Sequence, residues 1–583
     1  MQAKNHLQDL SVDRIRADLE HICGEIPTRL AGTPAGRKMA EFAHAQLTAA
    51  GAQSRIESFP GLVSFPEETQ FSVLGDKAYD IAAYTLGHSV PTSAAGITAE
   101  LIFIGSGGYE DYAGKDVTGK IVLLELSYHP GRHEKQRIAA ERGAAGCAMM
   151  NWGPDDNPVL PFGSVKPAWG NPTPEALKTE MATLPCVGIS REQGIKLKGL
   201  CAQAPVRVTL RAKVDNAWKE VHIVCGEIEP GLQSPSSKDF VIAGGHADSW
   251  YGPQATDNAA GSACLLELAR FFNKHRKLLR RGVHFGFWTG HETGTMVGST
   301  WYVDQHWDNL REHGVAYLQI DQPCCTGTSR WGSVSNSELR DMQESLDAAL
   351  MPEMDRSWRR TVKIGDASFY GVGVPMMSAQ TIFTQEELKR TANAGLGWWH
   401  HSIENTPDKV DFNQMGMHIR AFAAYLFELC TAVILPNRFR HVAKEIEVRL
   451  QALATAGKIV GLDSALDAAR AFSILAEKFD HKLDQIVDGG SAERHEQFVN
   501  DTLKKLSRIL LPVVGTTKDA YTHDTYSFTP QTTVLPGLYE TPELEKLEGE
   551  AKWSLQTKLR RERNRVVDAI NEASERMRAC MDL

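Results

Sequence analysis

The sequence predicts an α/β fold, with a mixed, mainly parallel sheet sandwiched by helices, an inserted β-rich domain and an α-helical C-terminal domain. Three patterns carry this prediction. Apolar strand-like runs alternate with helical segments from Phe240 to about Leu435. A shorter strand–helix rhythm runs from Gly119 to about Leu210. Beyond Asn437 the chain is rich in Ala, Leu, Glu, Lys and Arg at helical spacing.

Local patterns place the individual elements. Residues 1–23 form a polar amphipathic helical pattern, and residues 34–50 resume helical spacing after a Pro/Gly-rich break. Residues 119–125 have the pattern of a buried strand, and residues 143–151 form a small-residue turn into another strand. Helices are expected over residues 136–142, 440–512 and 542–582, with an irregular Pro/Thr/Gly-rich loop over residues 512–541.

These patterns divide the chain into four parts. We expect residues 1–88 to begin the α/β domain, residues 89–214 to form the insertion, residues 215–436 to complete the α/β domain, and residues 437–583 to form the helical domain. The division agrees with the length of 583 residues, which exceeds what a single hydrophobic core supports.

Composition narrows the classes of partner. The chain is 42% hydrophobic and 23% charged, as in ordinary globular proteins, and its net charge of −9 argues against nucleic acid or an anionic membrane as a partner. The first residues contain no apolar core of signal-peptide length, and no Cys-x-x-Cys pair occurs. We therefore expect no nucleic-acid or membrane partner and a cytoplasmic location.

Five residues with metal-binding side chains follow predicted strands or lie in turns. They are His246, Asp257, Glu292, Asp321 and His401. Four of them come directly after a strand or in a turn beside one. Since the carboxyl ends of parallel strands share one edge of a sheet, we expect these side chains to converge.

The types of these side chains favour zinc or a similar first-row divalent metal, because two imidazoles and three carboxylates are suitable ligands. If Asp257 were shared, two ions could lie ~3.5–4 Å apart, the spacing with which paired ions polarise a carbonyl and generate hydroxide. Asp248, two residues after His246, is expected to hold the other nitrogen of that imidazole.

Five motifs surround these residues: His246-x-Asp248, Gly252-x-x-Ala255-x-Asp257-Asn258-x-x-Gly261, Glu292-x-Gly294-x-x-x-Gly298-Ser299, Asp321 and His401-Ser402. In these motifs the chain resembles the M28 family of zinc peptidases, which includes co-catalytic aminopeptidases and the glutamate carboxypeptidase II and transferrin receptor branch. The resemblance is specific across about residues 243–408.

Further segments are similar to parts of the same family. Gly365-Asp366-Ala367-Ser368-Phe369 resembles the substrate-side loop of the family. The insertion resembles a protease-associated domain, and the helical region resembles in position the dimerisation domain of the carboxypeptidase branch. The resemblance implies a homodimer and two metal ions, most simply Zn²⁺. His246 and Asp321 would bind one ion, Glu292 and His401 the other, and Asp257 would bridge them.

Two positions depart from the family pattern. The family usually places two acids in tandem, the first as general base and the second as ligand, whereas this chain has His291-Glu292. In the carboxypeptidase branch a tyrosine often precedes the final histidine and stabilises the oxyanion; here His400 stands in that position. An imidazole with an unperturbed pKa of about 6.5 can still act as a base at neutral pH.

The sequence therefore predicts a dinuclear metal-dependent hydrolase that cleaves an amide or peptide bond in a peptide or a small amidated substrate. His291 would replace the usual general base, with Asp248 and His400 as further catalytic residues. One alternative is a non-peptidase reaction at the same metal site, either hydrolysis of an unusual amide or a lyase-type proton abstraction. A second is a catalytically inactive binding protein, against which the retention of all five ligands argues.

Overall fold

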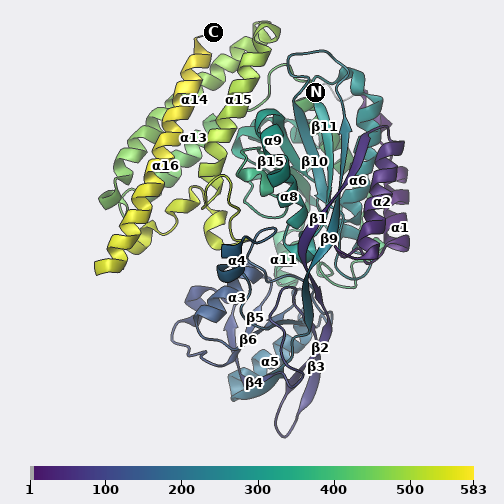
Figure 1. Cartoon of the computed structure of the whole chain (residues 1–583), viewed down its shortest axis with the longest axis vertical. Coiled ribbons are helices and arrows are strands. Elements are labelled where there is room, and N and C mark those ends of the chain that lie inside the picture. The colour runs from purple at the N-terminus through teal and green to yellow at the C-terminus, as the bar shows by residue number, and fades with distance from the viewer. Residues whose placement is uncertain (1–4, 583) are drawn as a thin grey trace.

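The main sheet of the computed structural model, which describes residues 5–582, has eight strands (Figure 1). In spatial order they are β1 (Gln53–Pro66), β9 (Val214–Ile228), β11 (Gly282–Trp288), β10 (Phe240–His246), β12 (Gly314–Gln319), β15 (Met376–Ile382), β13 (Arg330–Ser335) and β14 (Arg356–Arg360). The four strands from β11 to β15 are parallel, while β1, β9 and β13 introduce antiparallel pairings. The predicted mixed, mainly parallel sheet is confirmed.

Helices cover both faces of this sheet. One face carries α1 (Val12–Glu25), α2 (Pro34–Ala49), α6 (Ala260–Lys274) and α12 (Phe412–Thr431), and the other carries α8 (Val297–Gln305) and α9 (Trp307–His313). Alternate residues of β10 enter the two cores: Val241 and Ala243 pack on the first side, and Phe240 and Ile242 on the second. This period of two is the pattern of a strand buried on both faces.

The N-terminal helical pattern corresponds to α1, which a one-turn helix, Leu7–Asp9, precedes. Residues 1–4 of that pattern lie outside the described residues. Shorter helices complete the α/β domain: α7 (His291–Gly294), α10 (Arg340–Leu350) and α11 (Gln385–Arg390). None of the helices between residues 5 and 582 combines the length and the apolar character that crossing a bilayer requires.

The insertion is a closed barrel at the end of a two-stranded ribbon. β1 and β9 pair from Gln53 and Glu227 out to Pro66 and Val214, so the chain leaves and re-enters the main sheet side by side. The barrel strands are β2 (Glu68–Val73), β3 (Tyr79–Thr85), β4 (Ile97–Gly105), β5 (Ile121–Glu125), β6 (Gly146–Met150), β7 (Cys186–Ile189) and β8 (Val206–Leu210), with helices α3 (Arg132–Glu141), α4 (Pro174–Thr179) and α5 (Arg191–Gln203). The barrel thus begins at β2, ahead of the boundary expected at residue 89. The hairpin of β2 and β3 closes the barrel by pairing with β8 and β7.

The C-terminal region is helical, as the composition predicts. Its helices are α13 (Arg440–Leu453), α14 (Leu462–Asp488), α15 (Ala492–Gly515) and α16 (Gly549–Met581). Their apolar faces join the core that also contains α1, α6 and α12. The Asp480 carboxylate accepts hydrogen bonds from the backbone N–H groups of Phe439 (3.0 Å) and Arg440 (2.9 Å), which caps the start of α13 from a neighbouring helix.

A strap, defined here as residues 516–535, connects all three domains. Tyr526 N–H donates to the carbonyl of Pro167 (2.7 Å), and Thr529 N–H donates to Glu134 in the barrel domain (2.8 Å). Asp524 forms a fully buried ion pair with Lys363 of the α/β domain, at 2.8 Å. The strap therefore lies where the barrel, the main sheet and the helical domain meet.

Glu338 should make stability depend on pH. Burial raises the pKa of this carboxyl to about 7, beside Ser507 of α15. Between the unfolded value, about 4.5, and about 7, the unfolded chain ionises while the folded protein keeps the proton, so stability falls as pH rises. Glu338→Gln removes this penalty. We expect its free energy of unfolding to exceed that of the wild type by up to about 3 kcal/mol at pH 8 and to match it near pH 4.

Urea unfolding across this pH range measures the difference. Glu353→Gln, at an exposed position, is the control and should give a difference that does not vary with pH. A Glu338→Gln difference that is the same at pH 4 and pH 8 would contradict the assignment.

Candidate metal centre

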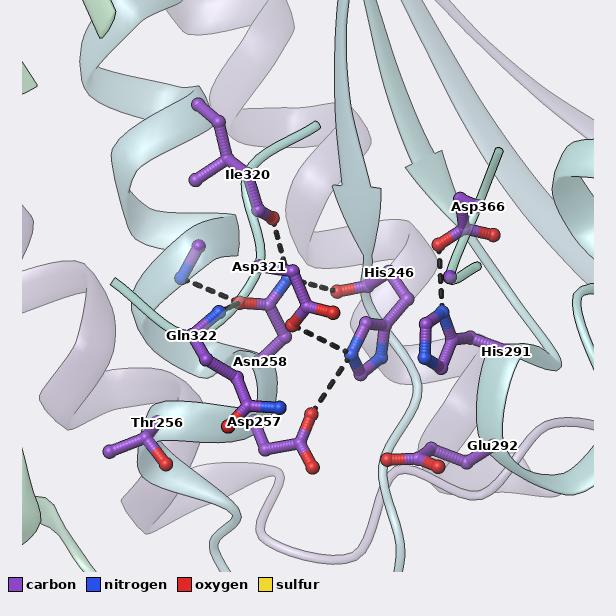
Figure 2. Close-up of polar contacts among 12 residues, drawn as sticks. His246, Thr256, Asp257, Asn258, His291, Glu292, Ile320, Asp321, Gln322 and Asp366 are labelled. Carbon is purple, nitrogen blue, oxygen red and sulfur yellow. Dashed lines mark hydrogen bonds and ion pairs between the residues drawn. The ribbon is translucent and has the colours of Figure 1, made fainter. Parts of the chain in front are cut away.

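The carboxyl ends of three neighbouring strands meet at one edge of the main sheet (Figure 2). β10 runs parallel to both β11 and β12. His246 is the last residue of β10, Glu292 follows β11 in α7, and Asp321 follows β12. Asp257 comes from the turn η4 (Ala255–Ala259) that leads into α6. The predicted convergence of these side chains is therefore present in the fold.

Asn258 attaches this turn to the sheet (Figure 2). Its side-chain amide donates to the carbonyl of Ile320 at 2.9 Å and to that of His246 at 3.3 Å, and its oxygen accepts from Gln322 N–H at 3.3 Å. One buried side chain thus connects the ends of β10 and β12 and places the preceding residue, Asp257, between them.

The five predicted ligands form two groups that share Asp257. On one side, His246 Nε2 lies 3.1 Å from Asp257 Oδ1 and 3.4 Å from Asp321 Oδ1. On the other side, His401 Nε2 lies 3.2 Å from Asp257 Oδ2 and 3.1 Å from Glu292 Oε1. Each oxygen of Asp257 therefore faces one of the two predicted histidine ligands.

Several atoms of this cluster are buried without a hydrogen-bond partner among the described residues. They are Asp257 Oδ2, Glu292 Oε1 and Asp321 Oδ1. Buried carboxylate oxygens normally have partners, because desolvating a charge without compensation is costly. These atoms belong to residue types that bind divalent metals, and separations of 3.1–3.4 Å suit neighbouring ligands of one ion. The cluster fits a divalent metal.

Electrostatics lead to the same conclusion. Burial would lower the pKa of His246, but the carboxylates of Asp321, Asp248 and Asp257 outweigh it and raise that pKa well above its usual value. Burial would raise the pKa of Asp257, but the imidazoles around it hold that pKa well below its usual range. The centre of the cluster therefore favours positive charge, which protons or a divalent cation can supply.

Asp248 contacts His246 differently from the sequence prediction. His246 Nδ1 lies 3.1 Å from the backbone carbonyl of Asp248 and 3.7 Å from its carboxylate. The carboxylate instead accepts the backbone N–H groups of His291 (3.1 Å) and Glu292 (3.2 Å) at the start of α7. Asp248 thus orients His246 through its main chain and positions α7 through its side chain.

His291 is held by a carboxylate that the sequence analysis did not select. Its Nδ1 donates to Asp366 Oδ2 at 2.8 Å (Figure 2). Asp366 Oδ1 in turn accepts from Ser299 Oγ at 2.7 Å. In the neutral form of the ring, the proton on Nδ1 leaves Nε2 as an acceptor. Burial and neighbouring His246 would both lower the pKa of His291, but Asp366 outweighs them and raises it to about 9.

His400 lies beside Asp257 and His401. Its Nδ1 is 3.2 Å from Asp257 Oδ2. Its ring stacks on that of His401, with centroids 3.9 Å apart, and on that of Trp152 from the barrel, at 5.3 Å. Burial, followed by the proximity of His401, lowers the pKa of His400 to about 4.

A family comparison assigns the two central domains. Residues 224–426 match the model of peptidase family M28, and residues 94–197 match the PA domain model. Residues 224–426 are a peptidase family M28 domain. The curated relatives include a probable glutamate carboxypeptidase VP8 from Zea mays, 26% identical over 350 residues, which are 50% of this chain and 48% of that protein. Another is aminopeptidase YwaD from Bacillus subtilis, 26% identical over 286 residues, 48% of this chain and 54% of that protein.

The chain thus spans about half the length of the curated relatives that it matches. Solved structures share its fold. An M28 peptidase precursor from Shewanella amazonensis aligns with a TM-score of 0.57 and 18% identity, covering 74% of this chain and 96% of that one. A zinc aminopeptidase from Bacillus subtilis aligns with a TM-score of 0.55 and 20% identity, covering 72% and 95%.

A cavity of about 790 Å³ opens onto the candidate metal-binding cluster of the M28 domain. Asp257, Asp321, His291, His400 and His401 line this cavity, and strands β13 and β14 contribute Arg330, Arg359 and Arg360. The cavity therefore contains both candidate ligands and three arginine side chains.

The PA domain and the strap also line this cavity, and sequence reasoning selected no individual site residue in either. From the PA domain, Arg132 Nη1 lies 3.1 Å from His401 Nδ1, and Trp152 stacks on His400. From the strap, Tyr526 Oη accepts from Gly365 N–H at 3.1 Å, next to Asp366. Among the residues that sequence reasoning missed, only Asp366 lies in a motif that could have identified it, namely the loop that resembles the family's substrate-side loop. Arg132, Trp152 and Tyr526 lie in segments without metal-binding or acid–base motifs.

Asp257→Asn should weaken both halves of the cluster, because each half uses one oxygen of this carboxylate. We expect the affinity for a divalent probe to fall by at least about 100-fold for each ion, with the folded structure retained. The measurement is competitive titration of metal-stripped protein with Zn²⁺ or Co²⁺ against a chromophoric chelator. Asp519→Asn, in an exposed part of the strap, is the control. Unchanged affinity in Asp257→Asn would rule out a shared ligand.

Proposed function

We propose that this protein is a metal-dependent hydrolase that cleaves an amide or peptide bond in a peptide or a small amidated compound. The proposal includes two divalent ions, with Zn²⁺ as the native metal, as in the zinc aminopeptidase that shares the fold. The observation that carries it is the shared Asp257, with one oxygen in each of two ligand groups. Ions bound there would polarise the scissile carbonyl and lower the pKa of an attacking water.

His291 would transfer the proton in this reaction. Its Nε2 would accept the proton of the attacking water and return it to the leaving amine, while Asp366 holds the tautomer through Nδ1. The pKa of His291, about 9 beside Asp366, would fall when a cation is bound next to it, because like charge disfavours the imidazolium form. Asp248 would position His291 and Glu292 by accepting hydrogen bonds from their backbone N–H groups.

Other residues would bind the substrate. Arg132, Arg330 and Arg359 face the cavity and suit polar or negatively charged groups of a peptide. The relatives include both aminopeptidases and a glutamate carboxypeptidase, so a substrate panel must contain free amino ends and free carboxyl ends.

A non-peptidase reaction is the second candidate function. The observation that favours it is the His291–Asp366 pair, at the position where the family motif has a carboxylate base. An imidazole with a raised pKa suits abstraction or donation of a single proton, as in a lyase, or hydrolysis of an unusual amide. An inactive binding protein is disfavoured, because all five ligand side chains are retained.

Self-association through the helical domain, residues 437–583, stays a prediction, as does the cytoplasmic location. Light scattering on the purified protein tests the first of these.

Substitution of His291 tests the mechanism. We expect His291→Ala to lower kcat/KM by about 10²–10⁴-fold with unchanged metal content, because the proton-transfer group is lost and the five ligands remain. The assay uses metal-replete protein and a panel of aminoacyl, acyl-amino-acid and dipeptide amides. His306→Ala, on a half-buried histidine outside the cluster, is the control. Full activity of His291→Ala on every substrate that the wild type cleaves would remove His291 from the mechanism.

Two further variants separate the candidate functions. His291→Glu restores the family pattern and should retain or gain ordinary peptidase activity if the reaction is peptide hydrolysis. Loss of the native reaction together with a gain of peptidase activity would favour the non-peptidase candidate. Asp366→Asn should lower kcat by about 10–100-fold and shift the pH profile, because the tautomer of His291 is no longer held.

A further inference from the structure

The second histidine of the His400-His401 pair is a predicted ligand, but the first has an unexplained nitrogen. His400 Nδ1 is buried and has no hydrogen-bond partner among the described residues. It lies 3.2 Å from Asp257 Oδ2, the same oxygen that His401 Nε2 approaches at 3.2 Å. Asp257 Oδ2 itself also lacks a hydrogen bond. Two imidazole nitrogens therefore converge on one carboxylate oxygen, and neither His400 Nδ1 nor that oxygen makes a hydrogen bond among the described residues.

The backbone explains why both rings lie on one side. His401 adopts a left-handed conformation with φ 54°, whereas consecutive side chains of an extended chain would point in opposite directions. The carbonyl of His401 accepts from Phe162 N–H at 2.6 Å, and Ser402 Oγ donates to the carbonyl of Trp399 at 2.6 Å. The turn is thus held in a conformation that a residue other than glycine seldom adopts.

The ring of His400 packs against two aromatic neighbours. His401 stacks on it with ring centroids 3.9 Å apart, and Trp152 of the PA domain lies 5.3 Å from it and 6.5 Å from His401. These contacts help to fix the orientation of the imidazole, with Nδ1 buried beside Asp257. His400, His401 and Asp257 together form a group whose candidate ligand atoms all lie within 4.8 Å of one another.

We propose that His400 is a metal ligand, through Nδ1, to the ion that His401 and Glu292 would bind. The inference rests on the proposed function, because it assumes that the cluster binds metal. It gives that ion four protein ligands, namely Asp257, Glu292, His400 and His401, while the other ion has Asp257, His246 and Asp321.

The two sides of the cluster then differ in kind. Four-coordinate metal sites with only protein ligands are typically structural, whereas catalytic sites retain an open position. On this assignment the open position would be on the His246 side, where His291 stacks on His246 with ring centroids 3.9 Å apart and has a candidate ligand atom within 4.8 Å of those of His246 and Asp321. Proton transfer and the open position would then belong to the His246 half of the cluster. Tight retention of a metal ion would belong to the His401 half.

Metal affinity tests this assignment without an activity assay. The full-length protein is stripped with dipicolinate, and Zn²⁺ is titrated in against a chromophoric chelator for the wild type, His400→Ala and His400→Gln. We expect two ions per wild-type chain. In both variants the ion beside His401 should bind about 10–100-fold more weakly or worse, and the affinity for the ion beside His246 should be unchanged. Removing only a hydrogen-bond partner of a metal ligand already costs about 10–100-fold in affinity, so removing a ligand should cost at least as much. His306→Ala is the matched histidine control.

Co²⁺ absorption provides a second measurement on the same proteins. Loss of a nitrogen ligand should change the visible bands of one Co²⁺ equivalent in both His400 variants and not in His306→Ala. Thermal unfolding of the metal-free variants shows whether they remain folded, and His400→Gln, which preserves side-chain bulk, replaces His400→Ala if the latter is unfolded.

The outcomes are distinguishable. If the wild type binds two ions and both His400 variants bind them with affinities within twofold of the wild type, His400 is not a ligand and the proposed function stands. If the wild type binds no ion, both the inference and the proposed function fail.

Discussion

The parallel pairing of β10 with β11 on one side and β12 on the other determines the geometry of the whole candidate site. A strand end is a point where the backbone leaves the sheet, and side chains at that point are free of the packing that surrounds the strand itself. Because all three strands run in the same direction, His246, Glu292 and Asp321 reach this edge together. A shift of β10 by one residue would turn His246 to the other face of the sheet.

Charge is the second constraint, and it follows from the first. Convergence places Asp257, Asp321 and Glu292 in a buried space where carboxylate oxygens lack hydrogen bonds. Such an arrangement is unfavourable for a folded chain unless positive charge is supplied. The opposite pKa shifts of His246 and Asp257 express this requirement, since each group favours its charged form in the presence of the other.

The sequence was most informative for features that depend on a local pattern of residues. His246, Glu292 and Asp321 could be selected because each follows an apolar run, and the helices α13 to α16 could be expected from spacing alone. The start of the barrel at β2 could not, because the short hairpin of β2 and β3 is assigned to the barrel only by its pairing with β7 and β8. Arg132 and His401 are 269 positions apart, and Gly365 and Tyr526 are 161 apart. No local pattern reports contacts between segments so distant.

Asp248 supports α7 through backbone N–H groups, and this has a consequence for how such a site can change over evolution. The hydrogen bonds that orient the helical turn do not involve the side chain of His291. An exchange of acid for imidazole at this position therefore leaves Glu292, one residue away, anchored by the same carboxylate. The residue proposed as the acid–base group can therefore be replaced while the neighbouring candidate ligand keeps its place, so a change of chemistry need not disturb the proposed metal site.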